Sequence, residues 1–262
     1  MSNLYTEVHG AGPPLLLLHG WGLNLRVWDT LIPALAPRFK VIAMDLAGHG
    51  RSAWNTNART LDGHAQCVAS TYDSLASNDA SMDVSNATIL GWSFGGQVAM
   101  TLAARFHRLV LTATSPKFAA SPDWPYGLSA PVLANFARQL ETDYRQTVSD
   151  FLDLQTRGSV NSAEVLATLR KALFTHGEAQ PEALTEGLKI LASTDLREAL
   201  PRITQRALVI SGQYDRVTPP GAGKALAESL PNAQHLEIRR AGHAPFLSHM
   251  DTFITALFDA TS

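Results

Sequence analysis

The sequence lacks the features that mark secreted, membrane-spanning and nucleic-acid-binding proteins. It has one cysteine, Cys67, so no disulfide can form within the chain, which is compatible with a reducing compartment. Lysine and arginine total 21 against 23 aspartate and glutamate, a net charge of −2 that gives no basic footprint for nucleic acid or an anionic membrane. The apolar run 15–18 is far shorter than the ~20 residues that span a bilayer, and residues 1–10 lack the pattern of a signal peptide. We therefore expect a soluble cytoplasmic protein.

Motifs for metals and nucleotide cofactors are also missing. There is no H-E-x-x-H and no paired-cysteine spacing of a metal site. Residues 221–224 (GAGK) resemble the end of a phosphate-binding loop, but Thr218 stands where the first glycine is required. Asp45 lies near glycines without the dinucleotide fingerprint, so a structural loop is favoured there. We predict that the protein uses no metal and no cofactor.

What the sequence does contain is a series of short apolar runs between turn residues. With 262 residues, 45% of them hydrophobic, the chain can bury a sizeable core. Such runs are typical of strands buried on both faces of a parallel sheet, and helical patterns separate several of them. This alternation predicts an α/β fold, with a mostly parallel central sheet and helices on both faces. The expected strands are 15–18, 41–44, 88–90, 109–114, 207–212 and, more weakly, 235–240.

The middle of the chain breaks this alternation. Four prolines open an irregular stretch after residue 115, and helical patterns then follow over 132–154, 163–174 and 181–192. We interpret residues 116–189 as a helical lid or cap inserted into one α/β core, which is formed by 1–115 and 190–262. The alternative is that these helices are ordinary crossover connections of the sheet.

A serine flanked by glycines follows one of the predicted strands. Residues 91–95 (GWSFG) fit G-x-S-x-G, with a strand before the motif and a helix after it. A serine on such a sharp turn has a strained backbone, and the glycines leave space for the turn, so the Ser93 hydroxyl projects above the sheet edge. The following helix also directs its N-terminal amides at developing negative charge. The motif predicts a nucleophile, and a packing corner with an incidental serine is the alternative.

A nucleophilic serine needs a histidine base that is oriented by a carboxylate. In α/β hydrolases these residues follow in the order Ser, Asp or Glu, His. Asp215 comes directly after the predicted strand 207–212, and His243 lies in a Gly-His turn after 235–240. Two competitors are weaker, because Asp195 is expected to precede or cap a helix ending near residue 200 and His249 lies in an apparent C-terminal helix region. We predict that Ser93, Asp215 and His243 are the catalytic residues.

Two backbone amides are expected to stabilise the oxyanion of the reaction. The amide of Phe94 follows the nucleophile, and the loop after strand 15–18 (HGWG) offers the amide of Trp21. His19 in that loop is interpreted as a structural side chain. We also expect Trp92 and Phe94 to supply apolar surface near the acyl site.

With these residues identified, the chain resembles the α/β-hydrolase superfamily throughout and, more narrowly, its pimeloyl-[acyl-carrier protein] methyl ester esterases. The superfamily motifs do not distinguish this subfamily by themselves. More specific similarity lies in segments spread along the chain, two of them in or beside the insertion. These segments are LLHGWGLNLRVW (17–28), GWSFGG (91–96), SPKFAASPDWP (115–125), FLDLQ (151–155), GLKILASTDLR (187–197) and AGHAPFLSH (241–249).

The resemblance implies a monomeric carboxylesterase of biotin biosynthesis that needs no cofactor. It would hydrolyse the methyl ester of a pimeloyl chain carried by acyl-carrier protein and release methanol. Ser93, Asp215 and His243 would form the triad, with Trp21 and Phe94 contacting the substrate near the oxyanion. By the same resemblance, four residues of the FLDLQ segment would line the acyl channel. They are Phe151, Leu152, Leu154 and Gln155.

One departure bears on the carrier protein. The family is expected to meet this acidic partner partly through basic lid residues, yet the stretch 116–190 has seven Lys or Arg against nine Asp or Glu. Arg138, Arg145 and Arg157 are candidates for a local basic face. The main alternative function is a promiscuous short-chain carboxylesterase without a dedicated carrier partner. Lactone opening, carbon–carbon bond cleavage and a non-catalytic receptor also share the pattern.

Overall fold

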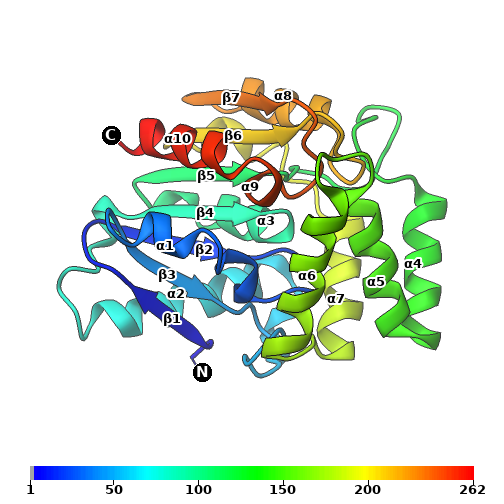
Figure 1. Cartoon of the computed structure of the whole chain (residues 1–262), viewed down its shortest axis with the longest axis horizontal. Helices are drawn as coiled ribbons and strands as arrows, with labels where there is room; N and C mark the ends of the chain where they lie inside the picture. The colour runs from blue at the N-terminus through cyan, green and yellow to red at the C-terminus, as the bar shows by residue number, and fades with distance from the viewer. Residues whose placement is uncertain (1–2) are drawn as a thin grey trace.

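Seven strands form one sheet in the order β1-β3-β2-β4-β5-β6-β7 in a computed structural model that describes residues 3–262 (Figure 1). All neighbouring strands are parallel except β1, which pairs antiparallel with β3 at one edge. This is the mostly parallel sheet that the alternating pattern predicts. The strands are β1 (Thr6–His9), β2 (Pro14–Leu18), β3 (Lys40–Met44), β4 (Thr88–Trp92), β5 (Arg108–Thr112), β6 (Arg206–Gly212) and β7 (Ala233–Ile238).

The six expected strands coincide with β2 to β7 within one or two residues. The prediction missed β1, whose four residues TEVH are half-exposed at the sheet edge and have no apolar run. Strand β5 is also shorter than predicted, because Ala113 leaves the extended conformation with a φ of 42°. Burial on both faces, the basis of the prediction, therefore identifies inner strands and not this edge strand.

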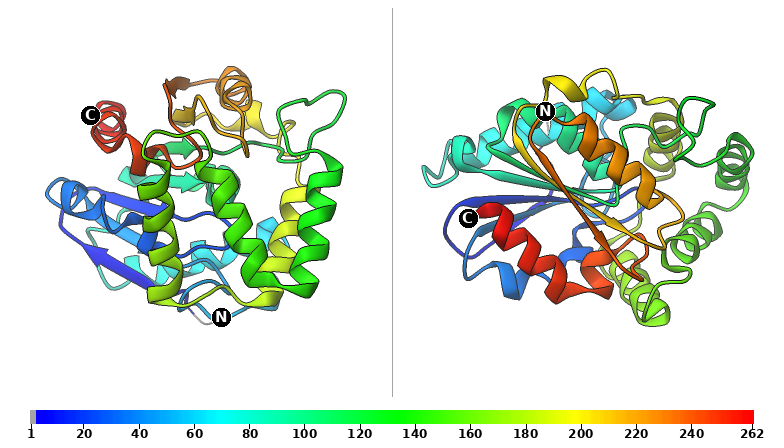
Figure 2. Two further views of the ribbon diagram at one scale, coloured as in Figure 1. Left: turned by 45° about the vertical axis from the view of Figure 1, so that its right-hand side comes forward. Right: turned by 90° about the horizontal axis from the view of Figure 1, so that it is seen from above.

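Helices cover both faces of the sheet, as expected for an α/β fold. The view from above in Figure 2 shows α1 and α10 on one face and α2, α3 and α8 on the other. Among them, α3 is followed by a 3₁₀ turn, Ala103–Arg105. No helix within residues 3–262 has both the length and the apolarity needed to cross a membrane. The core helices are α1 (Ile32–Leu35), α2 (Leu61–Ala76), α3 (Phe94–Thr101), α8 (Pro220–Ser229), α9 (Pro245–Ser248) and α10 (Met250–Thr261).

Four helices stand between β5 and β6, and Figure 1 shows them grouped beyond one end of the sheet. They are α4 (Ala130–Thr142), α5 (Tyr144–Thr156), α6 (Ser162–His176) and α7 (Pro181–Ser193). The single helix expected over 132–154 is wrong, because the chain breaks at Asp143, which ends α4 with non-helical φ and ψ of −153° and 88°. The Asp143 carboxylate then caps α5 by accepting from the amide of Gln146.

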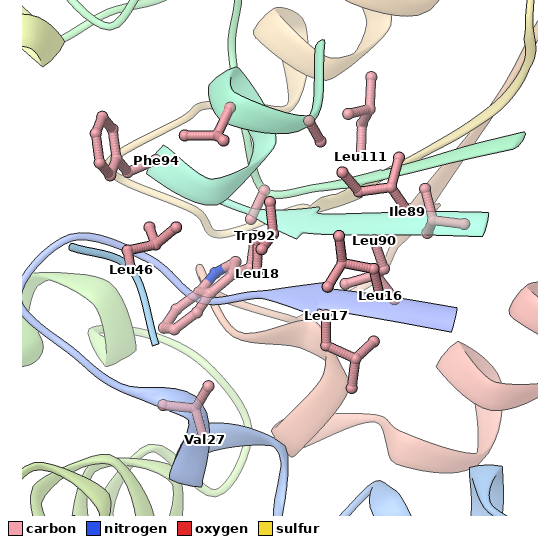
Figure 3. Close-up of a cluster of buried hydrophobic side chains, with 14 of the residues drawn as sticks. Leu16, Leu17, Leu18, Val27, Leu46, Ile89, Leu90, Trp92, Phe94 and Leu111 are labelled. Atoms are coloured by element: carbon pink, nitrogen blue, oxygen red, sulfur yellow. The ribbon is translucent and has the colours of Figure 1, made fainter. Parts of the chain in front are cut away.

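We call 116–189 the helical insertion. That it acts as a lid, separate from a core of 1–115 and 190–262, stays a prediction, and the first two residues of that core lie outside the described chain. Apolar side chains of the central strands belong to the hydrophobic core of the protein. The four leucines of 15–18 are fully buried, and Figure 3 shows Leu16, Leu17 and Leu18 beside Ile89, Leu90 and Leu111 of β4 and β5. This packing fixes the ends of the strands, from which the candidate site is built.

Candidate active site

Ser93 occupies the turn between β4 and α3. Its φ of 55° and ψ of −119° lie outside the regions favoured by non-glycine residues, as a strained strand-to-helix turn requires. A Cβ on Gly91 would lie 2.3 Å from the carbonyl oxygen of Gly95, and one on Gly95 would lie 2.5 Å from that of Leu18. The flanking glycines therefore allow the backbone to approach closely enough for the turn to form. Ser93 itself is 2% exposed.

Asp215 and His243 lie in contact although they are 28 positions apart in the sequence. Nδ1 of His243 lies 2.7 Å from Oδ2 of Asp215, and both side chains are fully buried. A carboxylate at Nδ1 selects the imidazole tautomer whose Nε2 is unprotonated. Among residues 3–262, this Nε2 is buried and has no hydrogen-bond partner. The nitrogen is therefore available to accept a proton.

The Asp215 carboxylate is held by three further donors. Its Oδ1 accepts from the amides of Val217 and Thr218 at 2.8 and 2.9 Å, and its Oδ2 accepts from the Thr218 hydroxyl at 2.6 Å. Hydrogen bonds to the charged form stabilise a buried carboxylate and fix its orientation toward the imidazole. In the sequence, Thr218 is noted only as a departure from the phosphate-loop pattern. In the structure, its amide and its hydroxyl both bind the Asp215 carboxylate.

The serine and histidine segments are joined through Trp92. Its indole Nε1 donates to the carbonyl of His243 at 2.7 Å, and its ring lies 5.7 Å from the imidazole. Trp92 is fully buried and does not line the pocket beside Ser93, so its expected role as acyl-site surface is not what this geometry shows. Phe94 likewise is absent from that lining and packs edge-on against His64. No local sequence signal indicates the Trp92 contact.

The two amides proposed for the oxyanion are both unengaged. Trp21 N and Phe94 N donate no hydrogen bond to any residue within 3–262. The loop that carries Trp21 lies against Ser93, since a Cβ on Gly20 would lie 3.2 Å from the Cβ of Ser93. His19 holds this loop, as expected, by bonding the Gly20 carbonyl through Nδ1 and the Leu46 amide through Nε2. Burial lowers the pKa of His19 well below its usual value, so it stays neutral.

A small apolar pocket opens beside Ser93. The helical insertion supplies most of its walls, and Ser93 and the Trp21 indole are its polar members. Its free volume is about 10 Å³, close to that of one water molecule. An acyl chain therefore enters only if the surrounding side chains shift. The lining residues are Trp21, Ser93, Phe118, Leu128, Leu133, Phe136, Phe151, Leu188, Leu191 and Val217.

Of the four residues of the FLDLQ segment, only Phe151 lines this pocket, edge-on to Trp21 at 5.1 Å. Leu152 lines a neighbouring hollow between α5, α6 and α7, whose floor includes Gly22. Leu154 and Gln155 line neither space. Instead, the main-chain carbonyl of Gln155 accepts a hydrogen bond from the amide of His243 at 3.0 Å. The segment thus contacts the candidate site in two different ways.

The competing acid and base lie elsewhere. Asp195 forms ion pairs with Arg197 and Lys117, and these hydrogen bonds lower the pKa of its carboxyl group. It does not precede or cap a long helix, which corrects that expectation, since only a 3₁₀ turn at Leu200–Arg202 follows. His249 sits at the junction of α9 and α10 and contacts the Ser248 hydroxyl. In the described chain, no group of three or more His, Cys, Asp or Glu is placed to hold a metal ion.

Within residues 3–262 no hydrogen bond joins the Ser93 hydroxyl to His243, whereas His243 and Asp215 are paired. The fold, the strained Ser93 turn and this buried pair are typical of one class of protein. Residues 13–250 match the alpha/beta hydrolase fold family, and the chain belongs to that family. Relatives named pimeloyl-[acyl-carrier protein] methyl ester esterase come from Nitrosomonas europaea and Stenotrophomonas maltophilia. Both are 38% identical, with 99% and 97% of this chain and 100% and 95% of the relatives covered. The narrower resemblance seen in the sequence is therefore confirmed.

Solved structures share the fold. An esterase from Exiguobacterium antarcticum superposes with a TM-score of 0.88 at 21% identity, covering 98% of this chain and 95% of that chain. An enol-lactonase from Burkholderia xenovorans has a TM-score of 0.78 at 24% identity, covering 98% and 95%. At these identities the likeness concerns the fold alone.

Proposed function

We propose that the protein is a serine carboxylesterase that hydrolyses the methyl ester of pimeloyl-[acyl-carrier protein], yielding pimeloyl-[acyl-carrier protein] and methanol in biotin biosynthesis. The observation that carries the chemistry is the buried Asp215–His243 hydrogen bond in the chain segment that Trp92 ties to the strained Ser93 turn. The substrate is supported by the full-length relatives of that name.

In this mechanism Ser93 attacks the ester carbonyl while Nε2 of His243 takes the hydroxyl proton. Asp215 holds the imidazole in the required tautomer and stabilises its cationic form. The amides of Trp21 and Phe94 bind the oxyanion. The imidazolium then protonates the departing methoxide. In the second half, His243 takes a proton from a water molecule that attacks the acyl-enzyme, and returns this proton to the departing Ser93 oxygen. The products are the free carboxylic acid and methanol, and no cofactor takes part.

The pocket beside Ser93 fits the hydrocarbon part of such a substrate. Its walls are apolar side chains, and no charged residue lines it. A methyl ester at the end of a polymethylene chain is uncharged and is compatible with this lining, whereas a free carboxylate would lose its hydration without gaining a partner. Phe151, and next to it Leu152, would contact the acyl chain, with Leu154 and Gln155 farther along the same helix.

Acyl-carrier protein is the proposed partner, and the insertion leaves some cations available for it. Arg145 and Arg170 are paired with Glu178 and Asp153. Arg138 and Arg157 form no ion pair with any residue of 3–262 and are exposed. Lys171 is likewise exposed and forms no ion pair within residues 3–262. These three cations of the insertion are the ones best able to contact an acidic carrier. The enzyme is proposed to act as a cytoplasmic monomer.

Two comparisons test the proposal. Ser93→Ala should lower turnover by a factor on the order of 10⁶, and a variant that keeps most of its activity would exclude this mechanism. kcat/KM is then measured for free methyl pimelate and for the carrier-linked ester. A strong preference for the carrier-linked ester supports the proposed substrate. Equal values would favour the alternative, a promiscuous short-chain carboxylesterase, which the small pocket and an insertion without excess positive charge also suit.

A genetic test addresses the physiological substrate. A strain that lacks its pimeloyl ester esterase should grow without biotin when it expresses this protein and not when it expresses Ser93→Ala. Failure of the active protein to restore growth, with p-nitrophenyl esterase activity intact, would keep the chemistry and reject the pathway role.

A further inference from the structure

The end of α5 and the turn after it contact the loop that carries His243. Figure 1 shows the α5–α6 connection beside the segment that leads into α9. Three hydrogen bonds join them. The His243 amide donates to the Gln155 carbonyl at 3.0 Å, the Gly242 amide donates to the Ser159 hydroxyl at 3.2 Å, and the Val160 amide donates to the carbonyl of Arg240 at 3.0 Å. The insertion therefore holds the main chain on both sides of Gly242.

The opposite side of the same loop rests on the segment that carries Asp215. The Tyr214 amide donates to the Ala241 carbonyl at 2.8 Å, and the Arg240 amide donates to the Gln213 side chain at 3.1 Å. Arg240 has a φ of 59°, a left-handed conformation that a non-glycine residue adopts only when its surroundings impose it. The histidine loop is thus a strained segment held between the aspartate loop and the insertion.

The main chain of residues 241–243 is held from two sides, by the aspartate loop and by the insertion. The aspartate loop engages the Ala241 carbonyl, whereas the amides of Gly242 and His243 are both satisfied by the insertion. Both residues are buried, so without those partners their amides would be left unpaired away from water. The position of the His243 main chain, and with it that of the imidazole, consequently depends on the position of residues 155–160.

The same helix also reaches the substrate pocket. Phe151 lines the pocket beside Ser93, and Gln155 lies one helical turn later in α5. Residues four positions apart lie on one face of a helix, so a shift of α5 at Phe151 moves the Gln155 carbonyl as well. Because the pocket must widen to admit an acyl chain, α5 links substrate entry to the histidine.

We propose that residues 155–160 position the catalytic histidine, with the Ser159 hydroxyl and the Gln155 carbonyl as its supports, so that the insertion and the base move together. Ser159 is a positioning residue, since it acts through the Gly242 amide and touches neither substrate nor imidazole. The proposal rests on the Ser–His–Asp chemistry proposed above and is independent of which ester the enzyme uses.

The test is Ser159→Ala in the full chain, assayed with p-nitrophenyl acetate. We expect kcat to fall roughly tenfold, as for the loss of one hydrogen bond that fixes the base, while KM changes less than about twofold. Ser159→Thr, which retains the hydroxyl, should recover most of kcat. Ser193→Ala is the matched control, because that serine ends α7 just beyond the insertion and, within residues 3–262, its hydroxyl bonds only the Lys189 carbonyl.

A second readout does not depend on turnover. The proton shared by His243 Nδ1 and Asp215 should give a resolved low-field NMR signal, and in Ser159→Ala it should broaden or exchange with solvent faster, but not in Ser193→Ala. A stronger perturbation is Gly242→Ala, whose new Cβ would lie 2.8 Å from the Gln155 carbonyl oxygen and 3.2 Å from the Ser159 Cβ. It should lower kcat further than Ser159→Ala.

The outcomes are separable. A folded Ser159→Ala protein with unchanged kcat and an unchanged low-field signal overturns the positioning role, as does a loss that Ser159→Thr does not restore. If Ser93→Ala retains activity, the proposed chemistry fails, whatever the Ser159 variants show. If Ser93→Ala is inactive and Ser159→Ala equals the Ser193→Ala control, only the positioning proposal is rejected.

Discussion

Trp92 donates its indole N–H to the main-chain carbonyl of His243, so the residue before the proposed nucleophile holds the residue proposed as its base. The 2.7 Å bond spans 151 positions of sequence and is buried. Trp28 is a suitable comparison, because its ring packs edge-on against that of Trp92 with the ring centroids 6.3 Å apart, and both side chains are fully buried. Unlike Trp92, the Nε1 of Trp28 has no hydrogen-bond partner among residues 3–262.

Replacing each tryptophan by phenylalanine therefore separates volume from hydrogen bonding. Both changes remove a similar volume from the same cluster, but only Trp92→Phe leaves a buried carbonyl unpaired. We expect Trp92→Phe to reduce the free energy of unfolding by about 1–3 kcal/mol more than Trp28→Phe, and to lower kcat as well. Urea denaturation and esterase assays measure both effects. Equal losses of stability in the two variants would show that the bond contributes nothing.

Thr218 is expected to assist Asp215 through its hydroxyl. Thr218→Val is nearly the same size, keeps the amide that donates to Oδ1, and removes the 2.6 Å donor to Oδ2. The carboxylate then has one fewer group fixing it beside His243, so kcat should fall roughly three- to tenfold with little change in KM. Thr218→Ser, which retains the hydroxyl, is the control and should stay near wild type. Indistinguishable kcat values for the valine and serine variants would contradict this role.

These cases show which parts of the site a sequence can predict. The strained turn at Ser93 is predictable because it needs glycines at fixed offsets, and the Asp215–His243 contact because each residue follows a strand in the expected order. The Trp92 and Thr218 contacts depend on which loops the sheet brings together, and no local pattern encodes that. The break at Asp143 was missed for a related reason, since the apolar periodicity of 132–154 continues across it and only the cap contact to Gln146 marks the new helix.

Gly187 in α7 should control the position of the Trp21 indole. A Cβ there would lie 2.7 Å from Trp21 Cδ1, and the indole is already fixed by a 3.0 Å bond from its Nε1 to the Leu184 carbonyl. Gly187→Ala gains helix propensity of about 1 kcal/mol but must displace the ring that lines the pocket. We expect KM for p-nitrophenyl hexanoate to rise severalfold and KM for the acetate to change less. Thr185→Ala, exposed on the same helix, is the control, and an unchanged chain-length profile in Gly187→Ala would refute the prediction.

Buried histidines should make the fold sensitive to acid. Burial lowers the pKa of His49 to about 4 and that of His64 to about 3. An unfolded histidine titrates near pH 6.5, so below that pH the unfolded chain binds protons that the folded chain does not. Each group therefore costs about 1.4 kcal/mol of stability per pH unit as pH falls from about 6.5 toward its folded pKa.

His64→Leu isolates one of these contributions. Neither ring nitrogen of His64 has a partner within residues 3–262, so the substitution breaks no hydrogen bond. Between pH 7 and pH 5 the variant should lose about 2 kcal/mol less stability than the wild-type protein, as measured by urea denaturation at both pH values. The same loss in both proteins would mean that His64 becomes protonated without unfolding.

His176 should anchor the helical insertion to the core. It is the last residue of α6, and its Nε2 lies 2.8 Å from Oδ2 of Asp45, with both side chains buried. Arg26 Nε donates to the other ring nitrogen at 3.2 Å, so the imidazole is neutral and donates to the carboxylate. His176→Leu leaves the Asp45 carboxylate with only its two amide donors, from Leu25 and Arg51.

Removing the donor to this buried carboxylate should destabilise the protein by about 1.5–3 kcal/mol, and because α6 loses its end contact, proteolysis within 157–180 should accelerate. His176→Gln is the matched variant, since its side-chain amide can donate in place of Nε2 and should restore much of the stability. Urea denaturation reports the global effect, and mass spectrometry of timed proteolytic digests locates the first cleavages. If the glutamine and leucine variants unfold at the same urea concentration, or if the first cleavages fall outside 157–180, the anchor is not this hydrogen bond.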